Sequence, residues 1–211
     1  MVKRMNEFKS VLKEATTELI EKKSRFISNV KPVNTESEAL DFIKKVNNIH
    51  KDANHNVYAY VINSNVGIER ASDDGEPQGT AGIPVLEVIK REHLTNICVV
   101  VTRYFGGILL GAGGLIRAYS ASARNGIVEA QICTMALYSR ISVKISYPYL
   151  GKIQNMVNSS ENTIINVQYT EYVKLYIKVK ANNLDNVINT LKEYTNGESE
   201  IECLGNFYDI T

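Results

Sequence analysis

The residues best suited to chemistry lie in a turn-rich segment at positions 71–82, which reads ASDDGEPQGTAG. Asp73, Asp74 and Glu76 place three carboxylates within four residues of a turn that contains glycine and proline. Hard cations such as Mg²⁺ favour carboxylate oxygens, so one interpretation is a metal or metal–phosphate site. The spacing is not that of a calcium-binding loop, which needs ligands at alternate positions. The other interpretation is an Asx-type turn that leads into a helix near Pro84.

A glycine-rich segment between Arg103 and Arg117 is the second candidate, and it reads YFGGILLGAGGLI. Free N–H groups at a helix N-terminus, together with two guanidinium groups, would bind a phosphate. The segment lacks both the GK[ST] of a Walker loop and the G-x-G-x-x-G spacing of a dinucleotide-binding turn. Its glycines also permit close packing of a helix on a sheet, so phosphate binding and packing both stay open. The glycines concerned are Gly106, Gly107, Gly111, Gly113 and Gly114.

The histidines and possible nucleophiles give weaker signals. His55 lies at the start of an expected strand, where two roles stay open: it joins the acidic turn across the sheet, or it is an ordinary surface or packing residue. The three histidines have no paired spacing, so we predict no metal site. The nucleophile motif G-x-S-x-G is absent and no cysteine has an activating context, so we predict no catalytic residue. No cofactor is predicted, and the residues favour a protein that is not an enzyme without deciding the matter.

Strands and helices must position these candidates in the first part of the chain. Thr35 and Glu38 have the spacing of a capping box and predict a helix start. The apolar run 97–104 has strand length, and we expect it to be buried on both faces. The glycine-rich segment then joins a buried strand to a helix. The expected strands are 17–22, 25–30, 56–63 and 97–104, and the expected helices follow Thr35 and cover 84–92 and 115–130.

After Met135 the alternation of apolar and polar residues is clean and predicts a separate domain. The order of elements is β-α-β-β-α-β over about 70 residues, which is the ferredoxin-like arrangement. We therefore predict an α+β protein with two domains, 1–135 and 136–211. The expected strands begin near 141, 162, 173 and 200, with helices after Pro148 and over 184–191.

The predicted second sheet carries a candidate nucleic-acid surface. Lys144, Lys174, Tyr176 and Lys178 alternate with apolar residues on the first and third strands, which are central neighbours in a ferredoxin-like sheet. Lysines around an aromatic ring suit single-stranded nucleic acid. The aromatic motif of an RNA-recognition motif domain is missing, and Glu200 and Glu202 on the fourth strand are expected to share the face. An ordinary solvated sheet face is the other interpretation.

Charge, cysteine content and apolar runs exclude several classes of protein. The 211 residues contain 24 Lys and Arg against 23 Asp and Glu, so any nucleic-acid contact must come from a local patch. Three separated cysteines without a CxxC motif fit reduced thiols rather than disulfides or zinc. The opening MVKRMNEFKS has no apolar core of a signal peptide, and no run of about 18 apolar residues occurs. We expect a soluble cytoplasmic protein without membrane contact, of unknown oligomeric state.

Two segments carry a family resemblance: SDDGEPQGTAGIP at 72–84 and VVVTRYFGGILLGAGGLIRAY at 99–119. The chain resembles the IMPACT/YigZ family over about 17–130, and the histidine-containing strand entry ANHNVYAY at 53–60 also fits. Val57 stands where the family often has cysteine, so no thiol role is carried over. The resemblance implies a first domain with the two-layer α/β fold of a small-subunit ribosomal protein and of elongation factor G domain IV. It implies a second domain like domain V of that factor.

The same resemblance suggests a function in translation. Two domain types shared with translation proteins make RNA or the ribosome the expected partner, in translation regulation or stress adaptation. Eukaryotic relatives that restrain a starvation-sensing kinase carry an additional N-terminal domain, so that activity is not carried over. A proline dipeptidase label has no supporting set of metal ligands here. The alternative is a small phospholigand-binding protein or enzyme that uses the acidic turn and the glycine-rich loop.

Overall fold

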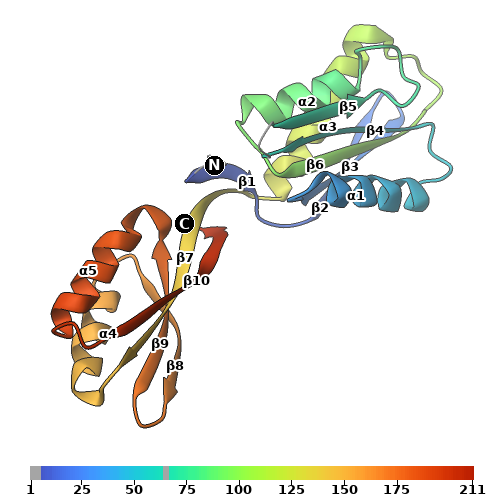
Figure 1. The fold of residues 1–211 in the computed structure, drawn as a ribbon. Coiled ribbons are helices and arrows are strands. Elements are labelled where there is room, and N and C mark those ends of the chain that lie inside the picture. Colours follow the sequence, from blue (N-terminus) through green and yellow to red (C-terminus); the bar gives the residue numbers. More distant parts are fainter. Residues whose placement is uncertain (1–5, 64–66) are drawn as a thin grey trace. The chain divides into compact units, whose positions relative to one another are not determined.

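The computed structural model describes residues 6–63 and 67–211. The chain divides into two compact units, of which the first comprises residues 8–134 and the second residues 6–7 and 135–211 (Figure 1). Each unit contains its own mixed sheet-and-helix core. The predicted α+β fold class with two domains is therefore confirmed.

The first unit is built on a sheet of five antiparallel strands with β6 at its centre. Every residue of β6 before Tyr104 is buried, because strands flank it on both sides and helices cover both faces. This is the burial that the unbroken apolar run predicts. In spatial order the strands are β2 (Ala15–Glu21), β3 (Ser24–Pro32), β6 (Ile97–Tyr104), β4 (His55–Ile62) and β5 (Ile68–Ser72).

Three helices cover this sheet. Helices α2 (Gly82–Arg91) and α3 (Gly111–Glu129) pack on the face that carries Val99 and Val101 of β6. Helix α1 (Glu36–Ile49) packs on the opposite face (Figure 1). It therefore adds a layer that the two-layer description does not include.

Helix α1 begins at the capping box that the sequence predicts. Thr35 caps α1 by accepting the Glu38 N–H at 3.2 Å, and the Glu38 carboxylate accepts the Asn34 N–H at 2.8 Å. Helix α3 buries Leu115, Tyr119 and other residues at helical spacing on one side, and its exposed side mixes polar residues with the apolar Ile116 and Val128. Across the described ranges, no helix combines the length and the apolar character needed to cross a membrane.

The second unit has the predicted ferredoxin-like order. Strand β7 lies between β10 and β9, and β8 forms the edge beyond β9. Helices α4 and α5 cover the face that carries Ile141, Val143 and Leu175. Two short strands were not predicted: β1 (Glu7–Val11), which pairs with β7, and β5 of the first unit. The early start of β7 at Ile132 was not predicted either. The main elements are β7 (Ile132–Ile145), α4 (Leu150–Asn158), β8 (Thr163–Tyr169), β9 (Val173–Lys180), α5 (Leu184–Tyr194) and β10 (Glu200–Ile210), with 3₁₀ turns at Tyr147–Tyr149 and Ala181–Asn183.

Candidate functional site

The first carboxylate of the acidic turn holds the start of helix α2. Asp73 accepts the N–H of Gly79 at 2.8 Å on one oxygen, and those of Ala81 and Gly82 at 3.0 and 2.8 Å on the other. Ala81, the N-cap residue, has no side chain that can cap. Asp73 therefore satisfies helix N–H groups that would otherwise lack a partner. This is the Asx-type role of the turn, and the described residues contain no group of three His, Cys, Asp or Glu side chains placed to hold a metal ion.

Substitution of Asp73 tests this role. Asp73→Ala removes the acceptor of three backbone N–H groups, so we expect a loss of about 2 kcal/mol in the free energy of unfolding. Asp73→Asn keeps an amide oxygen in place and should lose less than half as much. Urea denaturation of the three proteins measures both values. Equal stability of Asp73→Ala and the wild type would contradict the role.

The third carboxylate lies in a buried cluster with Arg103 and Tyr119. The Arg103 Nη1–H donates to Glu76 Oε1 at 2.6 Å, and the Tyr119 hydroxyl donates to the same oxygen at 2.8 Å. The side chains of Glu76 and Arg103 are 3% and 7% exposed, and Tyr119 is fully buried. Burial, and then the negative charge of Glu76, raise the pKa of Tyr119 far above its ordinary value, so its hydroxyl stays a donor. We call these three residues the buried ion-pair cluster.

Histidine 55 joins this cluster from the start of β4. Its Nδ1 lies 2.7 Å from the carbonyl oxygen of Asp74, which can only accept, so Nδ1 carries a proton. Its Nε2 lies 3.9 Å from Glu76 Oε1. The Asp74 carboxylate accepts the Asn56 N–H at 2.6 Å and so ties the turn to the same strand. His55 therefore lies against the acidic turn, which is one of the two roles left open for it, and all three carboxylates bind protein groups.

The glycine-rich loop packs closely against the turn between β2 and β3. The Gly106 N–H donates to the Ser24 hydroxyl at 3.2 Å, and a Cβ at Gly106 would overlap the backbone of Lys23 and Ser24. Gly107 and Gly111 have left-handed φ values of +82° and +69°, which favour glycine. The packing interpretation thus accounts for Gly106, while Gly113 and Gly114 lie in the uncapped first turn of α3.

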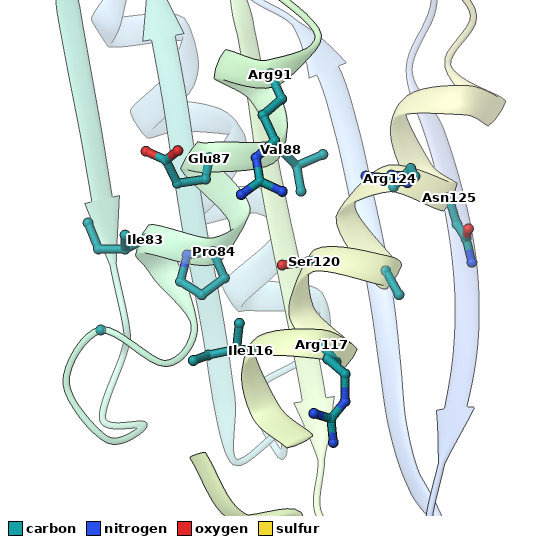
Figure 2. A pocket seen from close by; sticks show the side chains of 12 residues that line it. Ile83, Pro84, Glu87, Val88, Arg91, Ile116, Arg117, Ser120, Arg124 and Asn125 are labelled. Carbon is teal, nitrogen blue, oxygen red and sulfur yellow. The ribbon is translucent and has the colours of Figure 1, made fainter. Parts of the chain in front are cut away.

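Arg103 and Arg117, the two arginines that flank this loop, do not come together. Arg103 lies on the central strand and is paired with Glu76. Arg117 is exposed on α3, and the buried Tyr119 lies two positions further along, a rotation of about 200° about the helix axis. Arg117 lines a groove between α2 and α3 (Figure 2). The structure therefore does not form the predicted phosphate site with two guanidinium groups.

The four predicted nucleic-acid residues do share one face of the second sheet. Lys144 of β7 is the register partner of Lys174 in β9, and Tyr176 and Lys178 alternate with the buried Leu175 and Ile177. Helices α4 and α5 cover the opposite face, and on this one Lys174, Tyr176 and Lys178 are partly exposed. Sequence reasoning did not identify three further residues of this face. Tyr138 and Arg140 continue the alternation on β7, and Phe207 on β10 pairs with Tyr138.

Four of the cations on this face lie over aromatic rings, and a fifth, Lys180, pairs with Glu161. The distances from the charged group to the ring centroid are 5.2 Å for Arg140 over Phe207, 4.3 Å for Lys144 over Tyr172, 5.6 Å for Lys174 over Tyr176 and 4.6 Å for Lys178 over Tyr138. These distances are within the range of cation–π attraction. We call the eight residues of these four pairs the basic–aromatic face.

Carboxylates on β10 partly neutralise the basic–aromatic face. Glu200 pairs with Lys144 at 2.8 Å, and this hydrogen bond raises the pKa of the lysine. Asp209 pairs with Lys178 at 3.0 Å, which lowers the pKa of the carboxyl group. Glu202 lies opposite Ser142 in the register between these two pairs. The expectation that the glutamates share the face is confirmed, and its net charge is small.

Each of the two units matches a known protein family. The family described as "Impact N-terminal domain" matches residues 22–127, and the one described as "Domain of unknown function (DUF1949)" matches residues 143–198. The relative "IMPACT family member YvyE" of Bacillus subtilis is 43% identical over 88% of this chain and 85% of its own. For "IMPACT family member YigZ" of Escherichia coli K12 the values are 30%, 85% and 89%.

A solved structure is also similar to this chain over nearly its whole length. The "Crystal structure of an hypothetical protein" is 28% identical, has a TM-score of 0.62, and aligns over 96% of this chain and 99% of its own. The first-domain match covers the acidic turn, the buried ion-pair cluster and the glycine-rich loop, and the second-domain match covers much of the basic–aromatic face. The chain therefore belongs to the IMPACT family.

Proposed function

We propose that this IMPACT-family protein binds single-stranded RNA through the basic–aromatic face and acts in translation, at or near the ribosome. The observation that carries the proposal is the seating of four cations over four aromatic rings on one sheet face. Sheet faces with exposed aromatic rings are the usual platform on which proteins stack unpaired bases. Cytoplasmic location is part of the same proposal.

Stacking supplies most of the proposed affinity. An unpaired base on an aromatic ring contributes about 1–3 kcal/mol, and the neighbouring cation can reach the phosphate that follows it. Tyr172 is 37% exposed, and Tyr176 and Phe207 are partly exposed, so these rings are accessible to a base. Tyr138 is only 4% exposed and instead positions Lys178.

The carboxylates on the face limit the electrostatic contribution. An exposed ion pair contributes at most about 1 kcal/mol, so a phosphate can displace Glu200 from Lys144 or Asp209 from Lys178. The displaced carboxylates still repel the RNA backbone. We therefore expect binding of modest affinity with a shallow salt dependence. A phospholigand site at the acidic turn has less support, because Asp73 accepts three backbone N–H groups and Glu76 is paired with Arg103 and Tyr119.

A salt titration tests the proposal. With a fluorescein-labelled 12-nucleotide RNA at about 50 mM salt, Lys144→Ala/Lys178→Ala should weaken binding about ten-fold. It should also reduce the slope of log K against log salt by about 1.4, since two phosphate contacts are lost. Fluorescence anisotropy measures both quantities.

The control variant is Lys152→Ala/Lys192→Ala, which removes two exposed lysines from helices α4 and α5 and should leave RNA binding unchanged. Glu200→Gln/Glu202→Gln removes repulsion and should tighten binding. Co-sedimentation with ribosomal subunits at about 50 and 200 mM salt then tests the link to translation. An unchanged salt slope in the lysine variant would reject the basic–aromatic face as the RNA site.

A further inference from the structure

Helices α2 and α3 enclose a groove of about 640 Å³ on the outer side of the first unit (Figure 2). The volume lies within the range of protein binding sites. Its floor is apolar, with Pro84 and Val88 buried beneath it. Ile83 and Ile116 line the groove and are 50% and 42% exposed, so large apolar side chains face solvent from both helices. Exposed apolar surface of this kind is typical of sites that contact another protein.

Three arginines surround this apolar floor. Arg91 projects from α2, and Arg117 and Arg124 project from α3 (Figure 2). In the described part of the chain, none of the three has a hydrogen-bond or ion-pair partner. Glu87 is the one carboxylate among the lining residues, so the lining carries three positive charges against one negative charge. The groove thus combines apolar contact area with guanidinium groups that are free to bind carboxylates.

The spacing of the arginines sets the size of the occupant. Arg117 and Arg124 are seven residues apart on one helix, so their Cα atoms lie about 10 Å apart along its axis. Two acidic residues separated by two turns of a partner helix have the same spacing. Proteins commonly place the apolar face of an amphipathic helix in such a groove, with anchors at helical spacing.

We propose that the α2–α3 groove docks an acidic amphipathic segment of a partner protein. An apolar side chain of the segment enters between Ile83 and Ile116, and its carboxylates bind the arginines. RNA fits the groove less well, because no aromatic residue lines it and bases have nothing on which to stack. The proposal does not rest on the RNA-binding function, which uses different residues on the other unit.

A random 12-residue peptide library displayed on phage tests the proposal with the full-length protein. The library is selected on the wild type after depletion on Arg117→Glu/Arg124→Glu. We expect enriched sequences with at least two Asp or Glu and a large apolar residue. A synthetic fluorescein-labelled copy of the most enriched peptide should bind Arg117→Glu/Arg124→Glu at least ten-fold more weakly, because two ion pairs become repulsive contacts. Ile116→Ser should weaken it several-fold without any change of charge.

The matched control is Lys44→Glu/Lys51→Glu, which makes the same charge change at exposed sites outside the groove and should leave peptide binding intact. Arg117 and Arg124 are exposed, so the double variant should keep the thermal stability of the wild type. The proposal fails if no peptide is enriched, if the enriched peptides lack acidic residues, or if the arginine variant binds them equally. It also fails if that variant loses RNA binding instead, which would make the groove a nucleic-acid surface. Loss of RNA binding in Lys144→Ala/Lys178→Ala alone concerns only the basic–aromatic face.

Discussion

Replacement of Glu76 by alanine is expected to lower the free energy of unfolding of the first unit by about 3–5 kcal/mol. The carboxylate is 3% exposed and accepts hydrogen bonds from both Arg103 and Tyr119. Its removal leaves the Arg103 guanidinium charged and buried without a counter-ion. Arg103 Nη2 also donates to the neutral Ser24 hydroxyl at 3.4 Å, and Nε has no hydrogen-bond partner, so neither group replaces the lost negative charge. Guanidine hydrochloride denaturation measures the loss.

Two companion variants separate the lost charge from the lost hydrogen bonds. Tyr119→Phe removes one neutral donor and keeps the ion pair, so we expect a loss of about 1 kcal/mol. Glu76→Leu/Arg103→Met removes both charges and leaves apolar side chains beside Phe26, so it should recover most of the stability that Glu76→Ala loses. If Glu76→Ala and Tyr119→Phe lose equal stability, the buried charge is not what makes Glu76 important.

Sequence reasoning found the carboxylates of the acidic turn and included the Asx-type role of Asp73 among its two interpretations, but it did not foresee the buried ion pair of Glu76. Three acidic residues in a turn fit a metal site and a structural turn equally well, because residue type does not show which groups an oxygen faces. Tyr119 was missed because an aromatic residue on the apolar side of a helix looks like any other core residue. The role of its hydroxyl as a donor to Glu76 depends on the tertiary fold, which brings Arg103 of β6 and Glu76 of the turn to the buried side of the helix.

The second unit was predicted more completely, because its strands alternate strictly and its helices have clear apolar sides. Lys144 and Lys178 each alternate with residues buried in the core, so both must lie on the face away from it. Strand β1 has only five residues and pairs with a segment more than a hundred residues away, so no local pattern marks it. The cations of the α2–α3 groove come from two separate helices and are likewise invisible to a search for local motifs.

A comparison of two Gly→Ala substitutions in the glycine-rich segment is expected to give opposite signs. At Gly106, a methyl group would overlap the backbone of Lys23 and Ser24, which cannot rotate away as a side chain can. Relief requires the loop to separate from the β2–β3 turn and to break the hydrogen bond from the Gly106 N–H to Ser24. We therefore expect Gly106→Ala to lower the free energy of unfolding by about 3 kcal/mol. Thermal and urea denaturation both report this loss.

Gly113→Ala is the matched substitution, seven residues further along the chain and inside α3. Its φ is not left-handed, and a methyl group there would meet only the flexible end of Arg117 at an ordinary 3.6 Å. Alanine is the better helix former, so this variant should be as stable as the wild type or more stable by up to about 1 kcal/mol. Equal losses at both positions would mean that the whole segment tolerates no side chain, as a loop that closely cradles a ligand would require. Opposite signs would assign Gly106 to packing and leave the first turn of α3 free of that constraint.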